Sequence, residues 1–172
     1  MNQLSGNPFW DYSLVHYGRP EVARVCLELQ ENVGANVNLV LFCCWLGSFG
    51  QVLTVADLDE VEEVIQDWNE QVVEPLRGVR RFVQSEFAGF ADQEWPLEVK
   101  QLELKAERVV QNGLCNWWRK KSGSSMDSAD SGELGVRQQL QNLNLYLSRT
   151  GDVAINSGSP LVWPVVSAKL KS

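Results

Sequence analysis

NVNLVLFCCWLG, residues 36–47, is apolar at almost every position after Asn36. A helix without a polar face is buried by neighbours on all sides. The apolar run Val37–Leu46 is also too short to cross a bilayer, which takes about 20 residues. We therefore predict an all-α fold, a compact bundle of five or six helices around this central segment, with no membrane span.

Helix signals continue on both sides of the central segment. A helix is expected over residues 7–18, because Asn7-Pro8 combines a favoured N-cap with a proline that suits the first helical position. A second is expected over 19–33, before a glycine that is typical of a helix C-terminus. A long helix is expected over 95–121, again opened by a proline.

The most regular pattern is an apolar stripe over residues 58–87, with spacings of three and four that fit one face of a helix. Its members are Leu58, Val61, Ile65, Trp68, Val72, Leu76, Val79, Val83 and Phe87. Pro75 interrupts it, and proline removes one helical hydrogen bond. Either one helix kinked near residues 71–75 or two helices meeting there would fit. The stripe stays in phase across Pro75, which favours the kink.

The predicted core domain spans residues 5–121. Residues 122–132 are rich in serine and glycine, a composition that cannot bury a core and indicates a flexible linker. Residues 133–149 show apolar periodicity and predict a shorter amphipathic helix. Residues 150–172 contain prolines, glycines and serines and are expected to form an irregular C-terminal arm.

Composition excludes several classes of protein. The chain has 172 residues with 22 acids against 15 bases, a net charge of −7, whereas a general nucleic-acid binder needs a basic face. It has one histidine, which excludes di-histidine zinc sites and carboxylate-bridged di-iron bundles. Neither a catalytic motif nor a cofactor-binding motif is found, so no catalytic residue, cofactor or metal site is assigned.

Cysteine usage and the N-terminus indicate the compartment. The four cysteines lack metal-ligand spacing and lie mainly among apolar residues, which predicts free, buried thiols. The first seven residues are polar and uncharged, unlike a signal peptide. We therefore expect a soluble cytoplasmic protein.

Several segments in combination resemble a family of short, uncharacterised bacterial proteins found mainly in proteobacteria. The resemblance covers about residues 7–115 and begins with the motif N-P-F-W-D-Y-S. The matching segments are Asn7–Ser13, Asn36–Leu39, Trp45–Gly47, Trp68, Pro75–Arg77, Arg80–Arg81 and Glu103–Arg108. The resemblance implies an all-helical fold and no assigned activity.

One group of polar residues on the predicted helices is a candidate pocket. Its members are Asp11, Asn38, Arg77, Arg80, Glu103 and Glu107. Glu103 and Glu107 share one helix face, and an arginine can bind a carboxylate or phosphate through two hydrogen bonds. The two glutamates with Asp11 also offer oxygen ligands for Mg²⁺. The alternative is a structural network in which glutamates pair with arginines across helices.

The second candidate is an acidic face. Eight acids and no base lie between Asp57 and Glu74. Those that recur beside the apolar stripe are Asp59, Glu63, Asp67, Glu70 and Glu74. They could dock a basic protein partner, or form a solvated helix face that opposes aggregation. Pairing with Arg119–Lys121 or with Arg77, Arg80 and Arg81 inside the molecule is a further alternative.

The preferred function from sequence is a non-enzymatic interaction or regulatory module of the bacterial cytoplasm. Its contact surfaces would be the acidic face and the C-terminal arm. The alternative is small-molecule or Mg²⁺-dependent binding or catalysis in a helical pocket lined by four residues. They are Asp11, Arg80, Glu103 and Glu107.

Overall fold

The computed structural model describes residues 6–86, 94–123, 133–151 and 153–162. Within these ranges the regular structure is helical throughout. The elements are α1 (Pro8–Tyr17), α2 (Pro20–Val33), α3 (Val37–Ser48), α4 (Val55–Trp68), the π-helical turn η1 (Asn69–Val73), α5 (Glu74–Glu86), α6 (Glu94–Ser122) and α7 (Glu133–Thr150). Because α4, η1 and α5 are continuous, the described chain forms six helical rods, and the predicted all-α bundle is confirmed.

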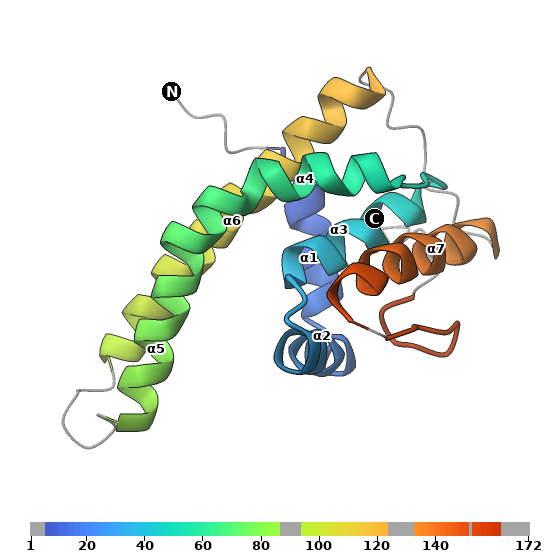
Figure 1. Ribbon diagram of the computed structural model, residues 1–172. Helices are drawn as coiled ribbons and strands as arrows, with labels where there is room; N and C mark the ends of the chain where they lie inside the picture. The colour runs from blue at the N-terminus through green and yellow to red at the C-terminus, as the bar shows by residue number, and fades with distance from the viewer. Residues whose placement is uncertain (1–5, 87–93, 124–132, 152, 163–172) are drawn as a thin grey trace, which may run out of the picture.

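Helix α3 is the centre of the bundle, as its sequence predicts. Every residue from Asn38 to Ser48 is buried, and the side chain of Asn36 caps the first turn. Phe9 of α1 packs against Phe42 and Trp45 of α3, with ring centroids 5.2 and 5.1 Å apart. Helices α1, α2 and α7 surround α3 (Figure 1).

The core extends beyond the predicted boundary at residue 121. Helix α7 lies along α3 and contributes Leu143, Tyr146 and Leu147 to the same apolar core (Figure 1). Small and polar residues, Gly135, Gln139 and Asn142, are also buried on α7. The element itself matches the amphipathic helix expected over 133–149.

The described part of the predicted C-terminal arm also packs on the core. Leu161 and Val162 are buried, and the Nε2–H of His16 donates to the carbonyl oxygen of Leu161 at 3.0 Å. The segment 153–162 is irregular, as expected, but part of the folded unit. Residues 124–132 of the predicted linker and residues 163–172 of the predicted C-terminal segment lie outside the described residues.

The rod formed by α4, η1 and α5 changes direction at the π-helical turn (Figure 1). Thr54 and Asp57 form a capping box that starts α4. The turn lies immediately before Pro75, and the backbone N–H of Glu74 bonds to the carbonyl of Asn69. Proline has no N–H to continue the helical ladder, which explains why the irregularity lies here. The π-helical turn begins at Asn69, two residues before the expected range of 71–75.

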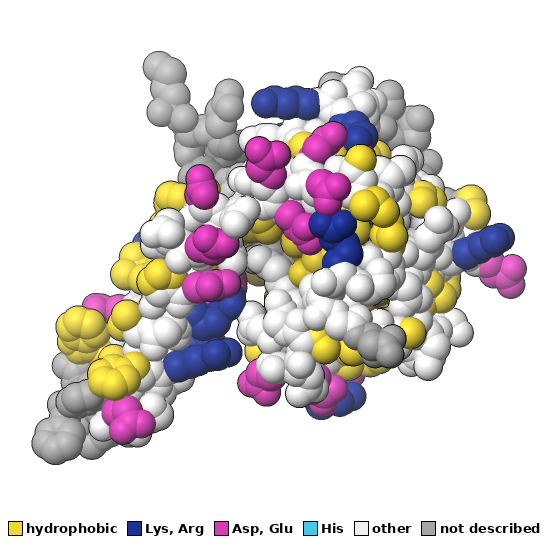
Figure 2. All heavy atoms as spheres, viewed as in Figure 1, with side chains coloured by type: hydrophobic (Ala, Val, Ile, Leu, Met, Phe, Trp, Pro, Cys, Tyr) yellow, Lys and Arg dark blue, Asp and Glu magenta, His cyan; other side chains and the backbone are white. Residues whose placement is uncertain are grey.

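An arm leaves the bundle beyond this turn. We use "arm" for α5 together with residues 94–108 of α6, and "body" for α1–α4 and α7. The two helices of the arm pack against each other, yet none of the side chains of α5 is buried (Figure 1). Figure 2 shows that the arm projects from the body with a hollow beside it. None of the described helices is long and apolar enough to cross a membrane.

Candidate functional site

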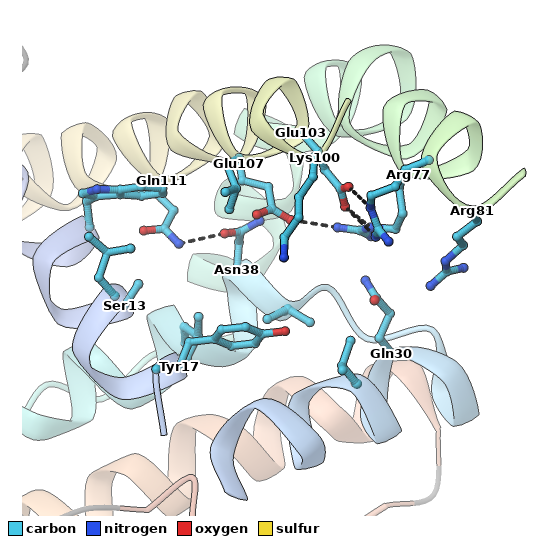
Figure 3. Close-up of a pocket in the computed structure, with 18 residues that line it drawn as sticks. Ser13, Tyr17, Gln30, Asn38, Arg77, Arg81, Lys100, Glu103, Glu107 and Gln111 are labelled. Carbon is cyan, nitrogen blue, oxygen red and sulfur yellow. Dashed lines mark hydrogen bonds and ion pairs between the residues drawn. The ribbon is translucent and has the colours of Figure 1, made fainter. Parts of the chain in front are cut away.

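A cavity of about 480 Å³ lies between the arm and helices α1, α2 and α3. One wall is apolar and comes mainly from the body. Its residues are Trp10, Leu14, Leu27, Val37, Leu41 and, from the arm, Leu104. The opposite wall is polar and comes from α5 and α6 (Figure 3). The volume is in the range of pockets that hold small organic ligands.

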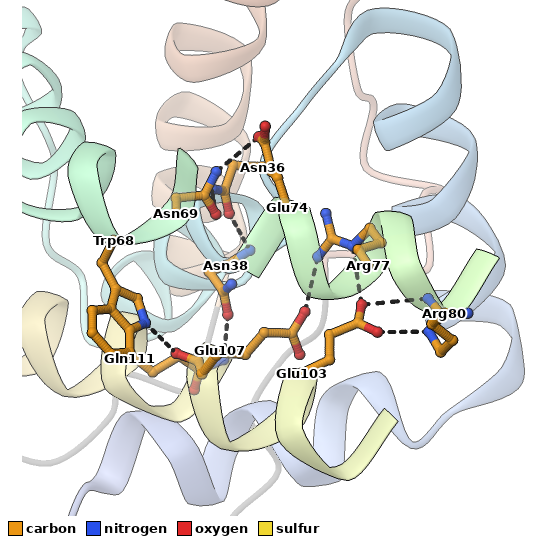
Figure 4. A network of polar contacts seen from close by, with 11 residues as sticks. Asn36, Asn38, Trp68, Asn69, Glu74, Arg77, Arg80, Glu103, Glu107 and Gln111 are labelled. Carbon is orange, nitrogen blue, oxygen red and sulfur yellow. Dashed lines mark hydrogen bonds and ion pairs between the residues drawn. The ribbon is translucent and has the colours of Figure 1, made fainter. Parts of the chain in front are cut away.

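Two arginines and two glutamates form an ion network along the arm. Arg77 donates to Glu103 at 3.1 Å and to Glu107 at 2.9 Å. Arg80 donates to both carboxylate oxygens of Glu103, at 2.6 and 3.3 Å. Figure 4 shows that both arginines come from α5 and both glutamates from α6. The geometry follows from spacing, because residues three or four apart lie on the same helix face.

The environment shifts the pKa values of the two glutamates in opposite directions. Burial acts against ionisation of Glu103, but hydrogen bonds from Arg80 and Arg77 outweigh it and lower the pKa of this carboxyl. Burial raises the pKa of Glu107, although Arg77 opposes the shift. Glu103 is therefore the fixed anion of the network, and Glu107 is the easier of the two to protonate.

The inner end of the cavity is polar and incompletely hydrogen-bonded. Gln111 donates through Nε2 to Oδ1 of Asn38 at 2.8 Å, which joins α6 to the central helix (Figure 3). The Oε1 atom of Gln111 and the Oγ atom of Ser13 have no partner among the described residues. Their residues are only 3% and 4% exposed, and both line the cavity. A buried polar atom without a hydrogen-bond partner costs free energy, so a ligand or a water molecule that bonds to these two atoms would stabilise the site.

The outer end of the cavity carries unpaired cations. Lys100 and Arg81 line it, and neither has an ion-pair partner among the described residues. Figure 3 shows the Lys100 amine, the Tyr17 hydroxyl and the Gln30 amide directed toward the same space, with Arg81 beside it. The lining has four cations and two acids, a net of +2, in a protein whose net charge is −7.

Sequence reasoning missed five of these residues: Ser13, Tyr17, Gln30, Lys100 and Gln111. A signal for the last two was present. Lys100, Glu103, Glu107 and Gln111 are spaced by three, four and four residues, so they share the face of α6 that the two glutamates define. Extending that face in both directions would have included both ends of the cavity.

Asp11 does not belong to the site, and its predicted place there is wrong. It is exposed and lines no part of the cavity. Phe9, Ser13 and His16 form the buried face of α1, and a residue two positions after Phe9 points roughly opposite to it. The Mg²⁺ set of Asp11 with Glu103 and Glu107 is therefore not assembled. Among the described residues, no group of three or more potential metal ligands gathers.

A second network fixes the base of the arm (Figure 4). The backbone N–H of Asn36 donates to the Tyr146 hydroxyl at 2.8 Å, and its side chain donates to Asn69 at 3.2 Å. Asn69 in turn donates to Glu74 at 2.9 Å. Trp68 donates to the carbonyl of Ala106 at 3.0 Å. The turn is thus tied to the N-cap of α3, which in turn contacts α7, while Trp68 ties the end of α4 to α6; these bonds hold the base of the arm.

The acidic face is partly used within the molecule. Arg149 pairs with Asp59 at 2.6 Å and with Glu62 at 2.7 Å, while Lys121 pairs with Asp57. Side-chain amides donate to two further members, Gln66 to Glu70 and Asn69 to Glu74. Glu63 and Asp67 are exposed and have no cationic partner among the described residues. The three arginines of α5 do not pair with this face; Arg77 and Arg80 pair with α6 instead.

Comparison with known families finds one match, over residues 8–114, to a protein of unknown function (DUF2390). The chain belongs to this family. The matched region agrees with the resemblance seen in the sequence and contains α1 to α5 and most of α6, including every residue that lines the cavity. No curated protein and no solved structure matches the chain.

Proposed function

We propose that this protein binds a small organic anion in the cleft between the arm and the body. The observation that carries the proposal is the reversal of charge: a cavity lined by four cations and two acids in a protein of net charge −7. Positive charge in a concave site concentrates anions from solution. The four cysteines are free and buried, which supports a reducing compartment such as the cytoplasm.

The chemistry of the lining defines the class of ligand. Lys100 and Arg81 can each form charge-assisted hydrogen bonds to a carboxylate or phosphate. The network with Glu103 keeps Arg77 and Arg80 extended beside them. The opposite wall is aliphatic and aromatic, so the ligand needs an apolar portion as well as its charge.

A purely structural role explains less of the geometry. Pairing across the arm accounts for Arg77, Arg80, Glu103 and Glu107. It does not account for cations at the outer end or for buried polar atoms without partners at the inner end. A bound amphiphilic anion accounts for both.

Isothermal titration calorimetry with sodium decanoate and with decyl phosphate tests the proposal. Both probes combine an anion with a hydrocarbon chain, and comparing them separates carboxylate from phosphate recognition. In the double variant Arg81→Ala/Lys100→Ala, affinity should fall by about tenfold or more, because each charge-assisted bond contributes roughly that much.

The matched control is Lys105→Ala/Arg137→Ala, which removes two exposed cations that do not line the cavity. This control should bind both probes as the unchanged protein does. Absence of binding to both probes would contradict the proposal. So would an equal loss in the two double variants, since that would indicate a general charge effect.

Protein interaction through the acidic face is a second candidate. The observation in its favour is that Glu63 and Asp67 are exposed without a cationic partner, whereas Asp57 and Asp59 are neutralised internally. A basic segment of a partner would complement them. Charge reversal at Glu63, Glu70 and Glu74 should then release co-purifying proteins, and retention of all of them would exclude this face.

A further inference from the structure

The two ends of the cavity differ in chemistry, and residues of one helix, α6, mark both of them. Lys100 and Gln111 are on the same face of α6, because their separation of eleven residues is close to three helical turns. That separation corresponds to about 16 Å along the helix axis. A ligand that reaches both ends must therefore be elongated.

The cations at the outer end, Lys100 and Arg81, select an anion. The inner end has a different requirement, because Ser13 Oγ and Gln111 Oε1 are both uncharged, buried and without a partner among the described residues. Figure 3 shows Ser13 and Gln111 together at the end of the cavity away from Arg81. A carboxylate cannot satisfy Gln111 Oε1, because both groups only accept hydrogen bonds.

A hydroxyl group fits the inner end, since it donates one hydrogen bond and accepts others. It can donate to Gln111 Oε1 and accept from the Ser13 hydroxyl at the same time. Between the two ends the wall is formed by apolar side chains, including Leu14, Val37 and Leu41. This middle section suits an unbranched hydrocarbon spacer.

We infer that the ligand of this cleft is a linear hydroxy acid, with its anion at Lys100 and Arg81 and a terminal hydroxyl at Ser13 and Gln111. The inference rests on the proposed function and specifies its ligand. The ligand therefore needs an extended spacer of several methylene groups, as a medium-chain aliphatic acid has, and ω-hydroxydecanoate is the test compound.

Calorimetry on the full chain compares ω-hydroxydecanoate with decanoate, which differs only by the hydroxyl. The unchanged protein should bind the hydroxy acid about tenfold more tightly, because decanoate leaves two buried polar atoms unsatisfied. Ser13→Ala should reduce that preference to about threefold or less, since the remaining hydrogen bond is to Gln111 alone.

Ser13→Ala is expected to fold normally, because Ser13 Oγ makes no hydrogen bond to a described residue. Gln111→Leu should likewise reduce the preference to about threefold or less, since only the bond from Ser13 remains, and it is the second variant. Circular dichroism confirms its folding, because it also removes the bond to Asn38. Ser148→Ala, an exposed serine on α7, is the matched control and should keep the full preference.

The outcomes separate this inference from the proposed function. If the unchanged protein binds both acids equally and loses both in Arg81→Ala/Lys100→Ala, the cleft binds anions but the hydroxyl site is wrong. If the preference exists but survives in both Ser13→Ala and Gln111→Leu, its assignment to the inner end is wrong. If neither acid binds, the proposed function fails together with the inference.

Discussion

Gly47 in α3 lies directly against the backbone of Gln139 in α7, so that a methyl group at position 47 would collide with main-chain atoms. This contact is the closest approach that a glycine makes in the described core. A flexible side chain can rotate away from a new methyl group, whereas a helix backbone must shift as a unit. The packing of α7 on the central helix therefore depends on the missing side chain.

Gly47→Ala should lower the free energy of unfolding by about 3 kcal/mol, because overpacking at a helix crossing displaces the backbone. Urea denaturation monitored by tryptophan fluorescence measures the change. Gly78→Ala is the control, since a methyl group there meets nothing within 4 Å. It should stabilise α5 by up to about 1 kcal/mol through helix propensity. Equal stability of the two variants would show that α3 and α7 are not in close contact.

Asn142 should be among the most sensitive positions in α7. Its side chain is fully buried, accepts from the backbone N–H of Leu53 at 2.8 Å, and donates to the carbonyl of Gln51 at 2.9 Å. Asn142→Leu keeps the branched shape but leaves these backbone groups without partners, at a cost of about 3 kcal/mol in urea denaturation. Gln141→Ala, at an exposed neighbouring position, should change stability by no more than about 0.5 kcal/mol.

Loss of Glu103 should destabilise the arm more than loss of an exposed glutamate. The side chain of Glu103 is only 8% exposed and holds both Arg77 and Arg80. Glu103→Ala leaves Arg77 with Glu107 alone and Arg80 with no acidic partner among the described residues, which should cost about 3 kcal/mol. Hydrogen exchange of α5 amides locates the effect in the arm. Glu98→Ala on the same helix is the control, and comparable exchange in both variants would contradict the network's role.

His16 should make folding stability depend on pH. Burial lowers its pKa from 6.5 to about 4, and its ring donates to the carbonyl of Leu161. Between these two values the unfolded chain binds a proton that the folded chain does not, so stability rises with pH across this window and levels off above it. Where His16 is fully protonated in the unfolded chain and neutral in the folded chain, the free energy of unfolding is lower by about 3 kcal/mol.

Urea denaturation at pH 4.5 and pH 7 compares the unchanged protein with His16→Gln, whose amide can still donate to Leu161. The variant should lose less stability on acidification. The carboxyl groups, including Glu103 and Glu107 with their opposite shifts, titrate in both proteins, so the difference between the two isolates His16. Identical losses would mean that His16 is accessible to protons in the folded state.

Local signals were sufficient for most helices. Asn7, Pro8 and Pro20 marked true helix starts, and the apolar segment after Asn36 is the buried central helix. The position of the kink was predicted to within two residues, because Pro75 acts through its own missing N–H. These features depend on residues close together in the chain.

Features that depend on distant segments were harder to predict. The core boundary at residue 121 was too early, because the apolar periodicity of α7 does not show which helix it packs on, and the contact with α3 also uses Gln139, Asn142 and a crossing at Gly47. Within the candidate site, the spacing of Glu103 and Glu107 was enough to place them on one face of a helix. Their pairing with arginines of α5 depends on how α5 packs against α6, which spacing does not show. Asp11 was misplaced although the burial face of α1 set by Phe9 already pointed away from it.

The position of α7 has a consequence for synthesis of the protein on the ribosome. Helix α7 is translated after all the helices that surround α3, yet it covers the side of α3 that carries Gly47. A nascent chain that has emerged only as far as α6 therefore exposes apolar surface of α3 to solvent. Folding of the core cannot be completed during translation of the first two-thirds of the chain, because α3 is fully covered only after α7 has been made.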